Sequence, residues 1–85
     1  MIVHDTRELG ALLRQRRKAA GVTTTQAAAM TGLSRRLLSE LERGKRRNVG
    51  IRAVFAIADL LGLSIAVEAR GLPGVRDRSR SGARV

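Results

Sequence analysis

The 85-residue sequence contains no cysteine, tryptophan or tyrosine, and it has one phenylalanine, one histidine and one proline. Without cysteine, the chain can form neither disulfides nor thiolate metal sites, a composition that suits a reducing compartment. The single histidine, His4, offers little for metal binding or imidazole catalysis, and we expect it to be exposed and without a role. With Phe55 as its one aromatic side chain, the protein is a poor candidate for stacking single-stranded bases.

Long apolar runs are also missing. No stretch approaches the roughly 20 apolar residues of a membrane span, and the N-terminal "MIVHDTREL" lacks the pattern of an export signal. A nucleophile–base pair, a carboxylate dyad and a phosphate-cradling glycine loop are all absent from the sequence. We therefore expect a cytoplasmic protein that does not contact membranes, needs no cofactor and is not an enzyme.

Acidic residues are scarce. Seven Asp and Glu face 17 Lys and Arg, which gives a net charge of +10. Residues 1–69 carry 12 basic and 6 acidic side chains, and residues 70–85 carry five arginines and Asp77. Such an excess indicates binding to a polyanion or an anionic surface. Because base-stacking aromatics are lacking, duplex DNA is favoured over RNA, and we expect the protein to associate with the nucleoid.

Four helices are predicted from caps and apolar spacing. The first begins at Asp5, which pairs with Glu8 in a capping-box pattern, and ends near Gly21. The second covers "TTTQAAAMTG", where Thr23 and Gln26 repeat that pattern before Gly32. The third follows Ser34, a strong N-cap residue, and stops at Gly44. The fourth runs from about Ile51 to Leu61, with Gly50 preferred over Asn48 as its N-cap.

The apolar residues of these helices predict the core. Leu9, Leu12 and Leu13 form the apolar face of the first helix. The later helices are expected to bury a further set of side chains: Met30, Leu37, Leu38 and Leu41. The fourth helix has two apolar faces. One is the stripe Ile51, Val54, Phe55, Ala58 and Leu61, which we expect to enter the core. The other, Ile57 and Leu60, is expected to contact a partner subunit.

After the fourth helix the period changes to strict alternation. The segment "LSIAVEA", residues 63–69, predicts a β-strand. A lone strand could pair with "MIV" at the start of the chain, but pairing with its own copy across a two-fold axis is favoured, which predicts a homodimer. The dimerisation residues expected from this reasoning are Ile57, Leu60, Leu63, Ile65 and Val67. Residues 70–85 are predicted to be a disordered basic tail, which leaves residues 1–62 as the folded domain.

The segment 31–47, "TGLSRRLLSELERGKRR", raises a question of charge. Arg35 and Arg36 follow the cap Ser34 on the first turn of a helix, where the macrodipole disfavours cations. An external polyanion would offset that cost. Two short helices joined by a tight turn, the second anchored by leucines and tipped with polar residues, describe a helix-turn-helix that enters a major groove. The guanidinium fork of arginine matches O6 and N7 of guanine.

The stretch "GVTTTQAAAMTGLSRRLLSELERGKR" resembles the XRE/Cro-type helix-turn-helix family. The matching residues are Gly21, Val22, Thr23, Ala28, Gly32, Leu33, Ser34, Leu38, Leu41, Glu42 and Gly44. The resemblance implies an all-α, lambda-repressor-like DNA-binding domain of four to five helices, here with a short C-terminal dimerisation strand. Thr24 stands where the family usually has a phosphate-clamping glutamine, and Ala27 replaces a larger core residue.

By the same register the resemblance implies base contacts from Arg35, Arg36, Ser39 and Glu40, and backbone contacts from Arg43 and Lys45. Arg17 and Glu42 take the places of a family ion pair. The full set expected to contact DNA is Arg17, Thr24, Thr25, Ser34, Arg35, Arg36, Ser39, Glu40, Arg43, Lys45 and Arg46. Some alternatives stay open: Glu40 accepts from cytosine or pairs with Arg36 or Arg43, and Arg17 contacts a phosphate or serves the fold.

Size and the segment "LLGLSIAVEAR" resemble HipB-like antitoxins, which are dimeric repressors that bind their own operator and a partner toxin, commonly a HipA-type kinase. The leading hypothesis is therefore an antitoxin of a type II toxin–antitoxin system that represses its own operon. The alternative is a stand-alone regulator, such as a phage-type repressor or a restriction-system controller, with no toxin partner. A third class, a basic protein that binds RNA or membranes, predicts no preference for a duplex sequence.

Overall fold

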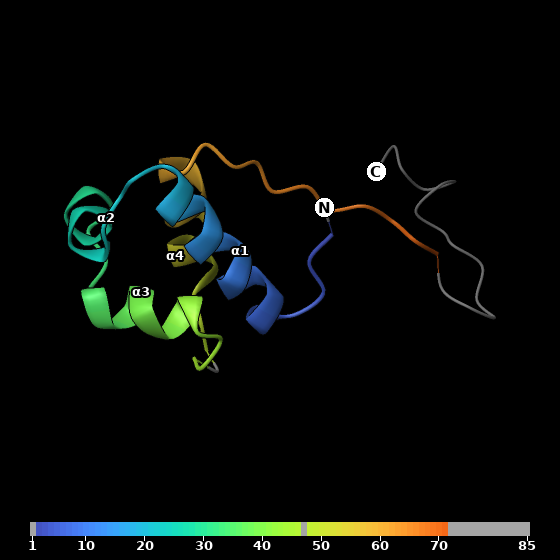
Figure 1. Ribbon diagram of the computed structural model, residues 1–85. Coiled ribbons are helices and arrows are strands. Elements are labelled where there is room, and N and C mark those ends of the chain that lie inside the picture. Colours follow the sequence, from blue (N-terminus) through green and yellow to red (C-terminus); the bar gives the residue numbers. More distant parts are fainter. Residues whose placement is uncertain (1, 47, 72–85) are drawn as a thin grey trace.

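The computed structural model describes residues 2–46 and 48–71, and helices account for all the regular structure in this part of the chain (Figure 1). They are α1 (Thr6–Ala19), α2 (Thr24–Thr31), α3 (Arg35–Glu42) and α4 (Ile51–Leu60). α3 packs against α1 and α2, and α2 also packs against α4. The all-α prediction is confirmed for these residues, with four helices. None of these helices combines the length and the apolar character that crossing a bilayer requires.

The helix starts follow the caps predicted from the sequence. Asp5 accepts a hydrogen bond from the backbone N–H of Glu8 at 2.8 Å, and Ser34 accepts one from Leu37 at 3.0 Å. At α2 the reciprocal box between Thr23 and Gln26 is complete. At α1 the second half of the box is displaced by one residue, because the Glu8 carboxylate accepts from the backbone N–H of His4 instead of Asp5.

The core is small and is drawn from all four helices. Its fully buried members are Leu13, Ala27, Leu38, Leu41 and Ile57. Ala27 is completely buried, so the small side chain allows α2 to lie directly against its neighbours. Partly buried apolar side chains pack around this cluster, among them Leu9, Val22, Leu33, Val49, Leu60, Leu61 and Leu63.

α1 and α3 approach each other most closely at Gly10, in the middle of α1. A Cβ atom built there would lie 2.2 Å from the carbonyl oxygen of Leu41 and 2.8 Å from that of Glu42. Glycine is unfavourable inside a helix by about 1 kcal/mol relative to alanine. Its presence here is explained by the contact, because any side chain would push the helix that carries Arg35 and Arg36 away from the core.

The structure corrects the expected core in two places. On α4, Ile57 is 1% exposed whereas Ile51 is 65% and Phe55 46% exposed. The face assigned to a partner therefore supplies a central core residue, and part of the stripe assigned to the core lies at the surface. Met30, expected in the core, is also exposed. α2 buries Ala27 instead, because a side chain without length permits the closest approach of the helices.

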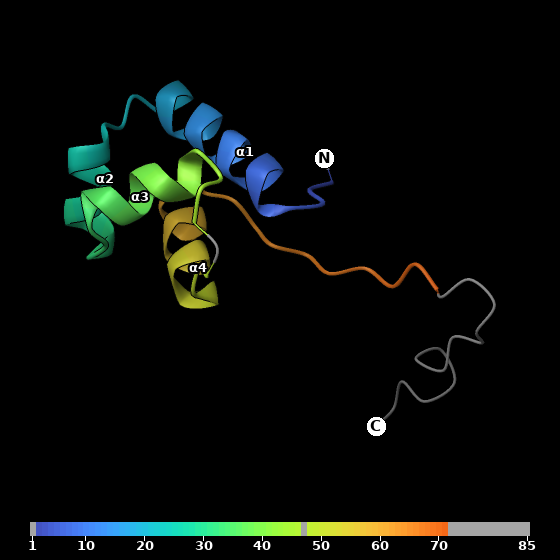
Figure 2. The same cartoon turned by 90° about the horizontal axis from the view of Figure 1, so that it is seen from below.

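The β-strand predicted at residues 63–69 is not present in the described chain. Leu63 still packs against the core, and residues 64–71 run away from the helices as an extended segment without strand pairing (Figures 1 and 2). A strand requires a second strand to satisfy its N–H and C=O groups, and residues 2–3 form no pair with this segment. Pairing with a second copy stays a prediction. Of the predicted tail, residues 72–85 lie outside the described residues.

Candidate nucleic-acid interface

The turn between α2 and α3 sets the angle of α3. Gly32 has a φ of +77°, in the left-handed region that favours glycine, and its N–H caps α2 through the carbonyl of Ala28. The hydroxyl of Thr31 donates to the carbonyl of Ala27 at 2.7 Å and accepts from the N–H of Leu33 at 3.2 Å. With its polar groups satisfied in this way, the turn holds α3 across the bundle (Figure 2).

α3 separates an apolar face from a polar one. Leu38 and Leu41 are fully buried and anchor the helix in the core, with Leu37 half-buried beside them. Arg35, Arg36 and Arg43 are exposed, and Ser39 and Glu40 are half-buried. This division places the polar residues predicted to read bases on the solvent side of an immobilised helix.

The N-terminal tip of α3 carries Ser34, Arg35 and Arg36, all exposed. A guanidinium nitrogen of Arg35 lies 3.3 Å from the hydroxyl oxygen of Thr25, on the first turn of α2. This contact links the starts of the two helices and places Thr25 and Arg35, both predicted to contact DNA, side by side. Because the hydroxyl is neutral, this contact places no negative charge against Arg35.

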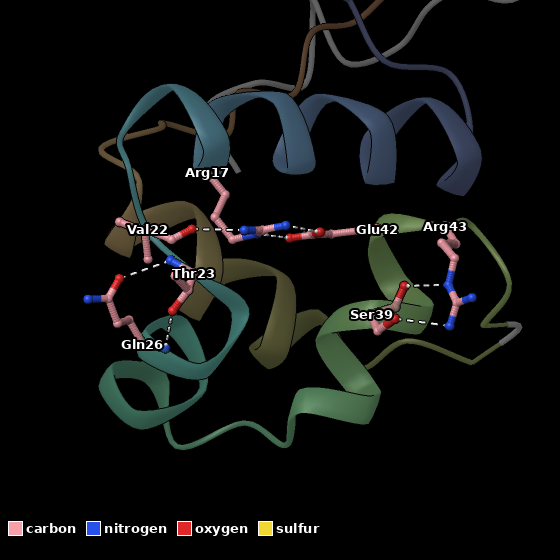
Figure 3. Close-up of polar contacts among 7 residues, drawn as sticks. All are labelled: Arg17, Val22, Thr23, Gln26, Ser39, Glu42 and Arg43. Atoms are coloured by element: carbon pink, nitrogen blue, oxygen red, sulfur yellow. Dashed lines mark hydrogen bonds and ion pairs between the residues drawn. The ribbon is translucent and has the colours of Figure 1, made fainter.

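Arg36 is paired within the chain. Its Nε donates to Glu40 Oε2 at 3.2 Å, while Nη1 of Arg46 donates to Glu40 Oε1 at 2.8 Å. These donors, Arg46 first and Arg36 second, hold the pKa of Glu40 below its usual value, against a smaller opposing effect of desolvation. The predicted pairing of Glu40 with Arg36 is present, whereas Arg43 instead donates to the hydroxyl of Ser39 at 3.0 Å (Figure 3).

Arg17 and Glu42 form a buried ion pair between α1 and the end of α3 (Figure 3). Nε and Nη2 of Arg17 donate to the two carboxylate oxygens at 2.6 and 2.9 Å, and Nη1 donates to the carbonyl of Val22 at 2.8 Å. The hydrogen bonds to Glu42 raise the pKa of Arg17, although burial acts in the opposite direction. The ion pair implied by the resemblance is thus confirmed.

The same geometry favours a role in the fold for Arg17 over a contact with DNA. The residue is 8% exposed, and all three nitrogens of its guanidinium group already donate to Glu42 or Val22. Burial and these hydrogen bonds leave little of the guanidinium group accessible to a phosphate. Arg17 therefore fixes the helix-turn-helix relative to α1.

The remaining predicted contacts surround α3. Lys45 is exposed and Arg46 half-buried in the segment after α3, and Thr24 is half-buried at the start of α2.

Sequence reasoning missed two features that build this surface: the close approach at Gly10 and the ion pair between Glu40 and Arg46. A glycine in mid-helix was a signal for the first. The ion pair joins residues six apart, which is outside helical spacing, so the sequence carried no signal for it. The described residues contain no cluster of three or more side chains able to hold a metal ion.

Comparison with known proteins agrees with this geometry. The family described as Helix-turn-helix domain matches residues 8–71. The structure is similar to the crystal structure of the restriction-modification controller protein C.AhdI from Aeromonas hydrophila, with a TM-score of 0.63 and 30% sequence identity. That likeness covers 69% of this chain and 88% of the other. No curated protein sequence gives a significant match. Since the family match spans most of the chain, the protein belongs to the Helix-turn-helix domain family, as an XRE-like DNA-binding regulator.

Proposed function

We propose that the protein is a sequence-specific transcriptional regulator that inserts the N-terminal part of α3 into the major groove of duplex DNA. The observation that carries this proposal is the pair Arg35 and Arg36 at the exposed tip of α3, a helix whose opposite face is buried in the core. A bidentate contact between arginine and guanine contributes about 1–3 kcal/mol of discrimination against other bases.

Phosphate contacts are proposed on both sides of the reading helix. At the helix starts, Thr24, Thr25 and Ser34 lie beside backbone N–H groups that favour anions. Beyond the C-terminal end of α3, cations supply the remaining contacts: the exposed Arg43 and Lys45 and, when released from Glu40, the half-buried Arg46. Such contacts position the protein on the duplex, while the tip of α3 and Ser39 read sequence.

We further propose that the protein acts as a homodimer. Ile51 and Phe55, one turn apart on α4, are exposed, as are Ile65 and Val67 in the extended segment. Exposed apolar side chains of this number indicate an interaction surface on a small domain. These four exposed residues replace Ile57 in the proposed dimer interface, because Ile57 is buried in the core. Leu60 and Leu63, also predicted to dimerise, are half-buried. Two reading helices would then meet half-sites about 34 Å apart.

Two kinds of regulator fit this description. The stand-alone controller is supported by the structural likeness to a restriction-modification controller protein. The HipB-like antitoxin rests on the resemblance of residues 60–70 and on the size of the chain, and no strand forms in that segment within the described chain. We therefore favour the stand-alone regulator. Isolation of the protein from its native cell in a stable complex with a toxin would reverse this preference.

The test begins with selection of a binding site from random duplexes by the purified protein, followed by footprinting. Arg35→Ala and Arg36→Ala should each lower the ratio of operator affinity to random-duplex affinity by about tenfold or more. Arg14→Ala, which removes the same charge from an exposed position on α1, serves as the matched control and should leave that ratio unchanged. Retention of full discrimination by both tip variants would refute α3 as the reading helix.

A further inference from the structure

Glu40 joins two of the cations that surround the reading helix. Each of its carboxylate oxygens accepts from a different guanidinium group, Oε2 from Arg36 and Oε1 from Arg46. Arg36 lies on α3 itself, whereas Arg46 lies in the segment that follows the helix. A single acid on the DNA-facing side of α3 thus engages one arginine placed to read a base and one placed to bind a phosphate.

The backbone holds this three-residue cluster together. The N–H of Lys45 donates to the carbonyl of Glu40 at 3.0 Å, which folds the segment carrying Arg46 back over the end of α3. The Glu40 side chain is 27% exposed and that of Arg46 40%. This partial burial makes the pair less screened by solvent than a fully exposed one. Arg36 is 86% exposed and hence the looser partner.

Phosphate oxygens and the Glu40 carboxylate compete for the same N–H donors. On a duplex of unrelated sequence, Arg36 and Arg46 can gain phosphate contacts only by exchanging one anionic acceptor for another, and Glu40 itself is repelled by the backbone. We propose that Glu40 is a specificity-determining residue that restrains Arg36 and Arg46 and thereby weakens binding to non-operator DNA. The proposal rests on the proposed function, since it assumes that α3 faces the duplex.

The restraint leaves the reading contact possible. Arg36 donates to Glu40 through Nε only, and within the described residues its two terminal nitrogens make no hydrogen bond. Those nitrogens form the fork that matches guanine. Glu40 therefore orients Arg36 along the helix while withholding it from indiscriminate contacts. Arg35, bonded to the neutral hydroxyl of Thr25, experiences no such competition.

The test compares Glu40→Gln with Glu68→Gln on short duplexes of random sequence and on the selected operator. Both variants raise the net charge by one, and Glu68 is exposed in the segment after α4. Glu40→Gln should bind random duplex about threefold to tenfold tighter than Glu68→Gln. Its salt dependence should steepen by about 0.9 for each additional phosphate contacted. The ratio of operator to random affinity should fall. Equal affinities of the two variants for random duplex would overturn the proposal.

A second comparison tests the route through the arginines. In a chain that carries Arg36→Gln and Arg46→Gln, the advantage of Glu40→Gln over Glu68→Gln on random duplex should shrink to the part that comes from direct repulsion between Glu40 and phosphates, because the coupled partners are gone. An undiminished effect in that background would refute the mechanism, as would a Glu40→Gln effect confined to one base pair of the operator. Loss of discrimination in Arg35→Ala and Arg36→Ala is measured in parallel. Its absence would refute the proposed function, whereas its presence with a silent Glu40→Gln would refute only the present inference.

Discussion

Replacement of Gly10 by alanine tests how the reading helix is attached to the fold. The added Cβ would lie 2.2 Å from the carbonyl oxygen of Leu41, where real Cβ atoms keep at least 3.0 Å from their neighbours. Both atoms belong to rigid helical backbone, so no side-chain rotation relieves the overlap. α1 and α3 must separate by roughly 0.8 Å in a core that is otherwise packed at crystal-like density.

The expected magnitude is a balance of two effects. Alanine is the better helix former by about 1 kcal/mol, and this gain offsets part of the steric cost. Overpacking of a core costs about 1–3 kcal/mol and more when backbone has to move. We expect Gly10→Ala to lower the free energy of unfolding by about 2 kcal/mol net. For a domain of this size, that corresponds to a decrease in Tm of about 10 °C.

The assay is urea and thermal unfolding followed by circular dichroism. Gly50→Ala is the matched control, because it makes the same replacement at a position where a Cβ meets nothing within 4 Å. It should change stability by less than about 1 kcal/mol. If Gly10→Ala were as stable as the unmodified protein, the close approach of α1 and α3 would be wrong, and with it the account of how Arg35 and Arg36 are held.

Three further outcomes are expected. Arg17→Gln leaves Glu42 buried without its partner and should lower the free energy of unfolding by about 3 kcal/mol. The double variant Arg17→Met/Glu42→Met should lower it by less. A single variant as stable as the double one would contradict a buried, coupled pair. The folded-state pKa of Glu40 is depressed, so its ion pairs stabilise the protein above the unfolded-state pKa and are lost as the pH falls through the folded-state pKa. The affinity difference between Glu40→Gln and Glu68→Gln on random duplex should therefore be constant around neutral pH and vanish only in acid, and a change between pH values well above the carboxyl range would refute this. Phe55→Glu should dissociate the proposed homodimer in sedimentation without loss of helix, while Ile2→Glu, at another exposed apolar position, should not; an intact Phe55→Glu dimer would remove α4 from the interface.

Local signals in the sequence predicted the helix boundaries well. Asp5, Thr23 and Ser34 each accept the backbone hydrogen bond expected of an N-cap residue, and Gly50 precedes α4 as preferred. These features depend on residues three or four apart, and their energetics are complete within one turn of the helix. The turn glycine Gly32 is equally local, because a positive φ is a property of one residue.

Which face of a helix enters the core could not be predicted in the same way. α4 is apolar on almost every side, so both the stripe with Ile51 and Phe55 and the face with Ile57 satisfy helical spacing. The decision depends on α2, whose Ala27 allows close packing and brings the buried face of α4, with Ala53 and Ile57, to the core. The prediction that Met30 is buried was wrong for the same reason. A side chain as long as methionine would hold α2 away from its neighbours, whereas Ala27 permits their close approach.

The strand predicted at residues 63–69 is not formed within the described chain, because alternation is a property of a segment, whereas a β-strand is a property of a pair. Residues 63–69 alternate as a strand should, but no described segment pairs with them as a strand. The exposure of Ile65 and Val67 shows that the chain alone does not bury their apolar surface. That surface is what a second subunit would cover.

The two arginines at the tip of α3 have different partners within the chain. Two arginines on a first helical turn imply an external anion if both are unopposed. The structure divides them: Arg35 meets only a hydroxyl, while Arg36 shares the Glu40 carboxylate with Arg46. Part of the negative charge that offsets the helix dipole is therefore already inside the chain. In the proposed complex, the unopposed charge at Arg35 would attract the helix to any duplex, whereas Arg36 would be released from Glu40 only where contacts with the bases offset the loss of that ion pair.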